Sequence, residues 1–288
     1  MAERSLAGPL EFGGLRMSWA PVHSAHAIER IRFEVIFVDA LPKKVIDAQR
    51  RLFEAQTQKF RFDAVKDQKT QKIFIGEPSN KSPIIQESEG WQSVRIASST
   101  MQPAEVVVLN PQMLVYESSE YRNWTTAKKR FISVVGEMIS RISDIVDFRS
   151  FSHDYTDRFV FQGAPEKANA KLILCGELFP LLPENTILGN ELWHIHRGWF
   201  ETRNGLRILI NQNLDMQDGT THIGDAVRSL QIYTKAEARL DADSQVVSDL
   251  EEFLSNLHLI CNENFAQVLS GEGREMLHID QKGAGGHG

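Results

Sequence analysis

Two long apolar stripes at helical spacing constrain the fold of this chain more than any other feature. The first stripe, between Trp124 and about Val146, consists of Trp124, Phe131, Val135, Met138, Ile142 and Ile145. The second, between about Ser244 and Leu269, consists of Val246, Leu250, Phe253, Leu257, Ile260 or Cys261, Phe265 and Val268. Each stripe predicts an amphipathic helix, which must cover its apolar side with another layer of structure.

The segments before each stripe alternate between apolar and polar residues, which is typical of strands. In residues 27–38, for example, Ile31, Phe33, Val35 and Phe37 fall on one side. Similar segments are 72–76, 91–99, 104–110 and 113–119 before the first stripe, and 150–162, 194–215 and 228–240 before the second. Residues 77–90 are expected to form a loop, and residues 166–179 fit a helix or a strand equally well.

This order of elements predicts an α+β fold made of two similar halves. In each half a mostly antiparallel sheet is covered on one face by its long helix. The expected divisions are an N-terminal arm (residues 1–24), a first half (25–150), a second half (151–280) and a glycine-rich, flexible tail (281–288).

Composition narrows the class of protein. The chain has 288 residues, 42% of them hydrophobic, which is enough to bury a sizeable core. A net charge of -6 gives no overall field that attracts nucleic acid. Cys175 and Cys261 are expected to be free thiols. No secretory signal and no apolar segment near the ~20 residues of a membrane span is present, so we expect a cytoplasmic protein without membrane contact.

The segment from His194 to Asp215 predicts a hairpin with a defined register. Asn204-Gly205 is the strongest short signal for a type I′ turn, because both central residues need a positive φ. Counting outward from this turn places His196 opposite Asn213, His194 opposite Asp215, and Gly198 opposite Asn211, all on one face.

This face has three open interpretations. His194 and His196, at i and i+2 on a strand, could bind one metal ion together with Asp215, and His153 or His222 would complete the shell. Alternatively, the side chains form a solvated sheet face, or a shallow polar binding face of Gly198, Asn211 and Asn213 in which Gly198 leaves room for a ligand or partner. Apart from this metal ion, no cofactor is expected, because the sequence contains no HExxH, paired CxxC, phosphate-loop or GxSxG motif.

Three segments carry a resemblance to a known family. They are "LVYESSEYRNWTTAKKRF", with Tyr121 and Trp124; "SHDYTDRFVF", with Tyr155 and Arg158; and "LHLICNENFAQVLSGEGREML", with His258 and Phe265. Together with "AIERIRFEVIF", they resemble an uncharacterised, sporadically distributed prokaryotic family of soluble α+β proteins of similar length. Two positions depart from its pattern: Asp154 stands where the family has arginine, and Ser270-Gly271 replaces the Thr-Asp/Glu that opens the last helix. The resemblance implies no catalytic residue, and its patchy distribution is typical of mobile defence or toxin–antitoxin systems.

These observations predict a non-enzymatic interaction subunit of a defence or toxin–antitoxin system. We expect it to bind a partner protein or to associate with itself. One alternative is a metal-assisted hydrolase that uses His194, His196 and Asp215. A second is a nucleic-acid-binding protein that uses the basic clusters at residues 48–53 and 127–131 on its helices.

Overall fold

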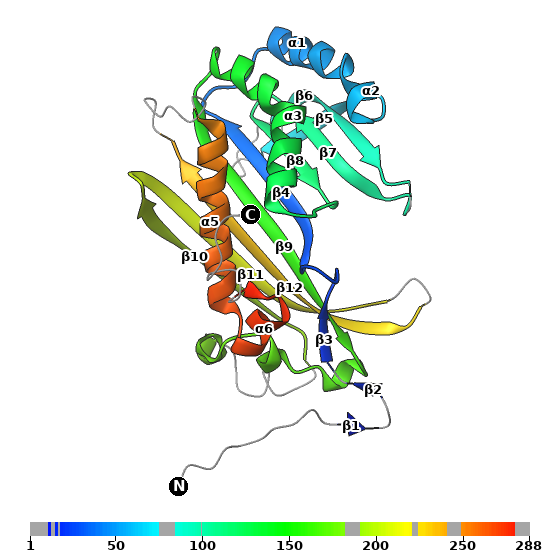
Figure 1. Ribbon diagram of the computed structural model, residues 1–288. Coiled ribbons are helices and arrows are strands. Elements are labelled where there is room, and N and C mark those ends of the chain that lie inside the picture. The colour runs from blue at the N-terminus through cyan, green and yellow to red at the C-terminus, as the bar shows by residue number, and fades with distance from the viewer. Residues whose placement is uncertain are drawn as a thin grey trace.

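The computed structural model describes residues 11–12, 15–16, 18–74, 84–98, 100–181, 191–220, 224–240 and 249–279. Over these residues the chain forms one ten-stranded sheet with helices packed on it (Figure 1). All neighbouring strands pair antiparallel. The predicted α+β class and the mostly antiparallel pairing are confirmed.

The strands of the sheet follow closely on one another in the chain. They are β3 (Ser18–Pro21), β4 (Ile28–Phe37), β5 (Lys66–Phe74), β6 (Ile84–Ile96), β7 (Pro103–Leu109), β8 (Met113–Ser118), β9 (Phe148–Gln162), β10 (Trp193–Arg203), β11 (Leu206–Thr220) and β12 (Ala226–Arg239). A separate two-stranded ladder pairs β1 (Glu11–Phe12) with β2 (Leu15–Arg16). The helices are α1 (Lys43–Glu54), α2 (Thr57–Phe60), α3 (Trp124–Ser143), α5 (Leu250–Val268) and α6 (Gly271–Met276).

The strand order of the sheet is β10-β11-β12-β9-β4-β8-β7-β6-β5, and β3 pairs with the end of β9. The two central strands, β9 and β4, pair with each other, so the sheet continues without a break from one predicted half to the other. The predicted boundary at residue 150 falls inside β9. The sequence pattern suggested a sheet for each half, but the chain builds a single one.

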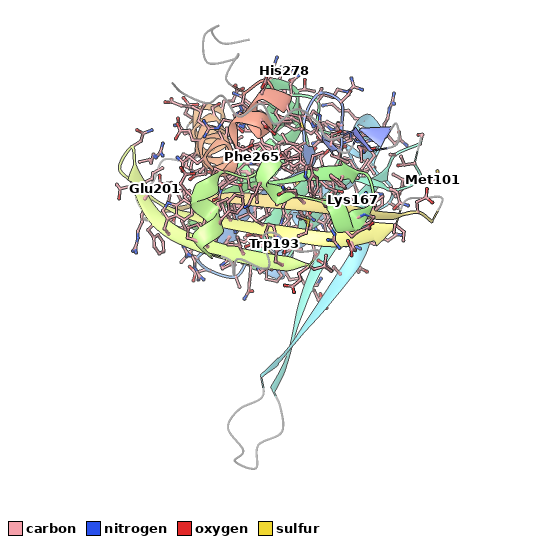
Figure 2. All side chains as sticks on the ribbon, turned by 90° about the horizontal axis from the view of Figure 1, so that it is seen from below. Met101, Lys167, Trp193, Glu201, Phe265 and His278 are labelled. Atoms are coloured by element: carbon pink, nitrogen blue, oxygen red, sulfur yellow. The ribbon has the colours of Figure 1, made fainter. Side chains whose placement is uncertain are left out.

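Both long helices lie on the same face of the sheet (Figure 1). The side chain of Asn123 caps α3 by accepting a hydrogen bond from the Thr126 backbone N–H, 2.9 Å away. Asp249 caps α5 in the same way through Glu252, at 3.0 Å. Seen from below, the helices lie above the sheet, and the β5–β6 ribbon extends away on the opposite side (Figure 2).

Two apolar clusters fill the space between sheet and helices. The larger one packs α1, α3 and the first turns of α5 against the sheet around Phe33, Phe131 and Phe151. The smaller one lies under the end of α5 and includes Phe159 and Leu269. The larger cluster contains residues of both predicted halves, so the division of the core does not follow the boundary at residue 150.

Several local predictions differ from the structure. The expected loop at 77–90 is shorter, because β6 begins at Ile84 and pairs with β5; residues 75–83 lie outside the described chain. The ambiguous segment 166–179 forms short 3-10 turns within η1 (Pro165–Lys167), η2 (Ala170–Leu172) and η3 (Gly176–Leu181). The start of the second predicted helix, the tail 281–288 and the first ten residues of the N-terminal arm lie outside the described residues.

Two further expectations concern the thiols and the membrane. Cys175 and Cys261 are both free, as predicted. Among the described helices, none combines the length and the apolar composition that a membrane span requires.

Candidate functional site

The predicted hairpin forms with the predicted register. Asn204 and Gly205 have φ values of 52° and 78°, as a type I′ turn requires. His196 pairs with Asn213, His194 with Asp215 and Gly198 with Asn211. The turn chemistry alone therefore determined which side chains share a face.

This face of the hairpin points away from the helices. The neighbouring residue Gln212 points toward α5, where its amide donates to the Asn264 carbonyl at 2.9 Å, so the adjacent Asn213 points the other way. On the outer face His194 Nδ1 is hydrogen-bonded to the Asp215 carboxylate, and His196 Nδ1 to the Asn213 amide oxygen. Each imidazole thus has its own partner on β11.

The structure brings together only part of the predicted metal site. Within the described residues, no three His, Cys, Asp or Glu side chains are grouped so that they could hold a metal ion. His153 cannot complete a shell around His194, because it is fully buried on the helix-covered face, where it stacks on Phe33. His222, the other proposed ligand, lies outside the described residues.

Gly198 does not leave an open space for a ligand. A Cβ atom at this position would lie 2.7 Å from Asn211 Oδ1 and 3.3 Å from the Ile210 carbonyl oxygen. The Asn211 side chain therefore fills the volume that the missing side chain of Gly198 frees. The expectation of room above Gly198 is wrong, because the cross-strand neighbour folds over it.

The same outer face of the sheet holds a buried acid at its centre. Asp154 on β9 is only 1% exposed, and neither of its carboxylate oxygens has a hydrogen-bond partner. Its direct neighbours across the sheet are Arg32 on β4 and Lys235 on β12. Burial raises the pKa of Asp154 to about 7, although these two cations oppose the rise.

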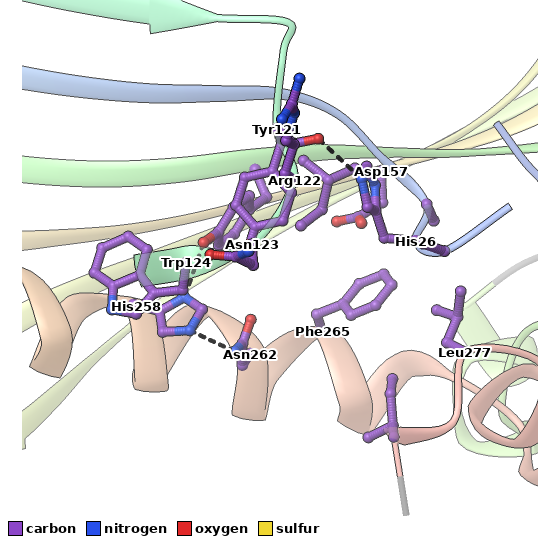
Figure 3. Close-up of a pocket in the computed structure, with 15 residues that line it drawn as sticks. His26, Tyr121, Arg122, Asn123, Trp124, Asp157, His258, Asn262, Phe265 and Leu277 are labelled. Carbon is purple, nitrogen blue, oxygen red and sulfur yellow. Dashed lines mark hydrogen bonds between the residues drawn. The ribbon is translucent and has the colours of Figure 1, made fainter. Parts of the chain in front are cut away.

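A pocket of about 420 Å³ lies on the other face, between the two long helices and β9 (Figure 3). Its walls come from five separate segments of the chain, which only the sheet order brings together. They are Ala25, His26, Ala27 and Ile28 before and at the start of β4; Tyr121, Arg122, Asn123 and Trp124 at the start of α3; Tyr155 and Asp157 on β9; His258, Asn262 and Phe265 on α5; and Leu277 and Ile279 after α6.

A chain of hydrogen bonds runs along one wall of this pocket (Figure 3). His258 Nε2 lies 3.0 Å from Asn262 Nδ2, and His258 Nδ1 lies 2.8 Å from the Tyr155 hydroxyl. Burial lowers the pKa of His258 to about 4, so the ring is neutral at pH 7 and carries one proton. With the Asn262 amide donating to Nε2, that proton is on Nδ1 and is donated to the Tyr155 oxygen. Tyr155 can then donate to Tyr121, whose pKa burial raises to about 12.

Asp157 forms part of the same pocket but takes no part in this chain. It is 3% exposed, and no hydrogen bond or ion pair from a described residue reaches its carboxyl group. Burial alone raises the pKa of Asp157 well above its usual range. A buried carboxyl group without a partner is costly in a folded protein, which makes this position a candidate for binding.

Apolar side chains form another part of the pocket. Phe265 points into it from α5, and Leu277 lies beside it (Figure 3). His258, Asn262 and Phe265 recur at helical spacing, so one face of α5 supplies a whole wall. Arg122 and Asn123 are exposed and therefore lie at the mouth, whereas Tyr155 and Asp157 are buried at the floor.

The sequence did not identify this pocket as the candidate site, although five of its residues had been singled out for another reason. Tyr121, Trp124, Tyr155, His258 and Phe265 all belong to the three segments that carry the family resemblance. Taken singly, each fits a core position. Their convergence on one cavity was the missing signal, and it depends on the strand order.

One arginine of each basic cluster forms ion pairs within the protein. Arg50 pairs with Glu54 and Asp67, and Arg130 donates to Glu105 through two nitrogens, at 2.8 and 2.6 Å. Charges neutralised in this way contribute little to an electrostatic footprint for nucleic acid.

Comparisons with known proteins assign no family to this arrangement. No protein-family model matches the chain, and no curated protein matches its sequence.

Proposed function

We propose that this protein is a binding protein that holds a small molecule in the pocket between β9, α3 and α5. The observation that carries the proposal is the carboxyl group of Asp157, which has no partner among the described residues, at the floor of a cavity of about 420 Å³. Small-molecule sites are typically cavities of roughly 300–1,000 Å³ with apolar walls and a few convergent polar groups. This pocket has that size, and polar and apolar side chains contribute about equally to its walls.

The polar groups of the pocket favour binding over catalysis. A general acid or base works best when its pKa lies near the working pH. Burial instead lowers the pKa of His258 to about 4 and raises that of Tyr121 to about 12, and it also raises the pKa of Tyr155. These groups hold fixed protonation states at neutral pH, which suits a rigid hydrogen-bonding wall.

Native mass spectrometry of the purified protein tests this proposal. After incubation with a small-molecule extract of bacterial cells, we expect a retained ligand that is released on denaturation. Phe265→Ala should abolish retention because it removes a pocket wall, whereas Leu259→Ala on the same helix should not, since Leu259 is 55% exposed and lies outside the pocket. Equal retention of the ligand by both variants would place the ligand elsewhere. If neither variant retains a ligand, the proposal loses its basis.

A second candidate function is that of an interaction subunit, in which the outer sheet face contacts a partner protein or a second copy. In the part of the chain that the structure describes, no helix covers this face, and His194 and His196 are exposed on it. Such surfaces become interfaces when a partner satisfies their polar groups. Membership of a defence or toxin–antitoxin system would supply a partner of this kind.

Affinity purification from the native host, followed by mass spectrometry of the captured proteins, tests this second candidate. A charge reversal on the outer face, Lys235→Glu, should reduce capture of a specific partner. The control is Lys129→Glu on α3, an exposed position on the helix side. Capture that is insensitive to Lys235→Glu would contradict a partner on the outer face.

We further propose that the chain consists of two similar halves, as the order of its elements suggests. The pairing pattern supports this: the first strand of each half pairs with the last, β4 with β8 and β9 with β12, and a long helix follows that last strand in both. The resemblance to the sporadically distributed family would extend over both halves. Expression of residues 25–150 alone, followed by circular dichroism, would test whether one half folds independently.

A further inference from the structure

The chemistry of the pocket narrows the class of ligand, given the binding function proposed above. We propose that the ligand carries a planar, positively charged nitrogen group, such as an amidinium or guanidinium, which pairs with Asp157 at the floor of the pocket. The rest of the ligand would lie against Phe265, Leu277 and the exposed mouth at Arg122.

The buried carboxyl group of Asp157 requires a partner. Its carboxyl group is almost fully buried, and no donor among the described residues reaches it. Elsewhere in the protein a buried carboxylate is matched by cations: Glu105, at 2% exposure, accepts from Arg95 and Arg130. The pocket supplies the space for such a cation without supplying the cation itself. A ligand that brings two parallel N–H donors would satisfy both oxygens of Asp157.

The shape and polarity of the pocket walls favour a flat cation. No aromatic ring among the described residues pairs with that of Phe265, and the pocket is also lined by His26 and Ile28. Flat cations are well suited to a space lined by aromatic and aliphatic side chains, because they combine charge with stacking. A compact, strongly hydrated ammonium would lose more solvation in the same space.

The floor of the pocket is unfavourable for an anionic group of the ligand. An anion beside Asp157 would face a carboxyl group, and the wall behind it offers the hydroxyl groups of Tyr121 and Tyr155 but no buried cation. Arg122, the one arginine among the described residues that line this pocket, is exposed at the mouth. An acidic group on the ligand would therefore lie outward, near Arg122, and the cationic group inward.

Three probes of nearly the same shape test this inference: benzamidine (cationic), benzamide (neutral) and benzoate (anionic). In isothermal titration calorimetry at pH 8, we expect benzamidine to bind at least about tenfold more tightly than benzamide, because only benzamidine pairs with the carboxylate. Asp157→Asn should remove this preference and leave benzamide nearly unchanged. The matched control is Asp154→Asn, which changes the same chemical group on the same strand but on the opposite face.

The pH profile provides a readout that a purely structural role of Asp157 would not change. Binding a cation requires the ionised carboxylate, so the affinity for benzamidine should rise with pH, whereas that for benzamide should stay flat. The titratable or charged groups around Asp157 are Tyr155 on β9, His26 before β4, Tyr121 before α3, and His258 and Cys261 on α5, with Arg122 at the mouth of the pocket. His26→Gln should keep the pH dependence, which assigns it to Asp157.

The outcomes separate this inference from the proposed function. Equal affinity for benzamidine and benzamide would overturn the cationic ligand but would support a pocket for small molecules. Tighter binding of benzoate would overturn it as well. If none of the three probes binds and native mass spectrometry finds no retained molecule, both the ligand class and the proposed function are wrong.

Discussion

The imidazole of His258 lies flat against the indole of Trp124, with ring centroids 4.1 Å apart and an angle of 8° between the planes. His258 belongs to the middle of α5, and Trp124 is the first residue of α3. The two rings thus join the long helices of the chain directly above β9. One stacked pair both closes a wall of the pocket and connects the parts of the chain on either side of it.

Replacing Trp124 should therefore weaken the whole fold. Besides His258, its indole contacts the rings of Phe33 and His153, with centroids 6.2 and 5.3 Å away. We expect Trp124→Leu to lower the free energy of unfolding by about 2–4 kcal/mol, since removing a large aromatic side chain from a packed site costs this much. Urea denaturation measures the change. Leu259→Ala, an exposed control on α5, should change stability by less than about 0.5 kcal/mol.

His258 should make the protein less stable in acid. Burial lowers the pKa of His258 from its ordinary value of 6.5 to about 4 in the folded protein. The unfolded chain therefore binds a proton that the folded chain does not, and stability falls as the pH decreases from about 6.5 to about 4. His258→Gln should remove up to about 3 kcal/mol of this dependence. Parallel stability curves for the variant and the wild type over this range would contradict the assignment.

Asp154 should act in the opposite direction. Burial raises the pKa of Asp154 from 3.8 to about 7 in the folded protein, so the folded chain retains a proton that the unfolded chain loses. Stability contributed by the protonated acid is complete below about pH 4 and is lost as the pH rises to about 7. Between pH 4 and pH 8, the difference in the free energy of unfolding between Asp154→Asn and the wild type should shift in favour of the variant by up to about 4 kcal/mol. Urea unfolding at both pH values measures this difference.

The contact between Gly198 and Asn211 predicts a coupled pair of substitutions. Gly198→Ala should cost about 1 kcal/mol, because the new Cβ would lie 2.7 Å from Asn211 Oδ1. In an Asn211→Ala background the same change should cost much less, since the colliding atom is absent. Melting temperatures of the four proteins of this cycle measure the coupling. Additive effects would show that the Ile210 carbonyl, 3.3 Å away, limits the space instead.

Sequence reasoning succeeded where local chemistry decides the structure. The register of the β10–β11 hairpin follows from Asn204-Gly205 alone. The long helices were visible because their apolar stripes repeat over several turns. None of these features depends on contacts between distant segments.

The candidate site could not be predicted in this way, because distance along the chain hides it. Asp157 reads as an ordinary polar residue in a strand, and only the pairing of β9 with both β4 and β12 buries it. The same pairing moves His153 to the face opposite His194, which removes it from the proposed metal shell. Burial in the middle of a wide sheet depends on strand order, and periodicity does not reveal that order.

The position of β9 also limits how this protein can change over time. Its residues 150–157 are all buried, and Asp154 and Asp157 point to opposite sides of the sheet. Inserting or deleting a single residue before them would exchange the two sides, placing His153 and Tyr155 outside and Asp154 among the aromatic rings. We therefore expect viable variants of this chain to differ in the lengths of their connecting loops, while the length of this one strand stays fixed.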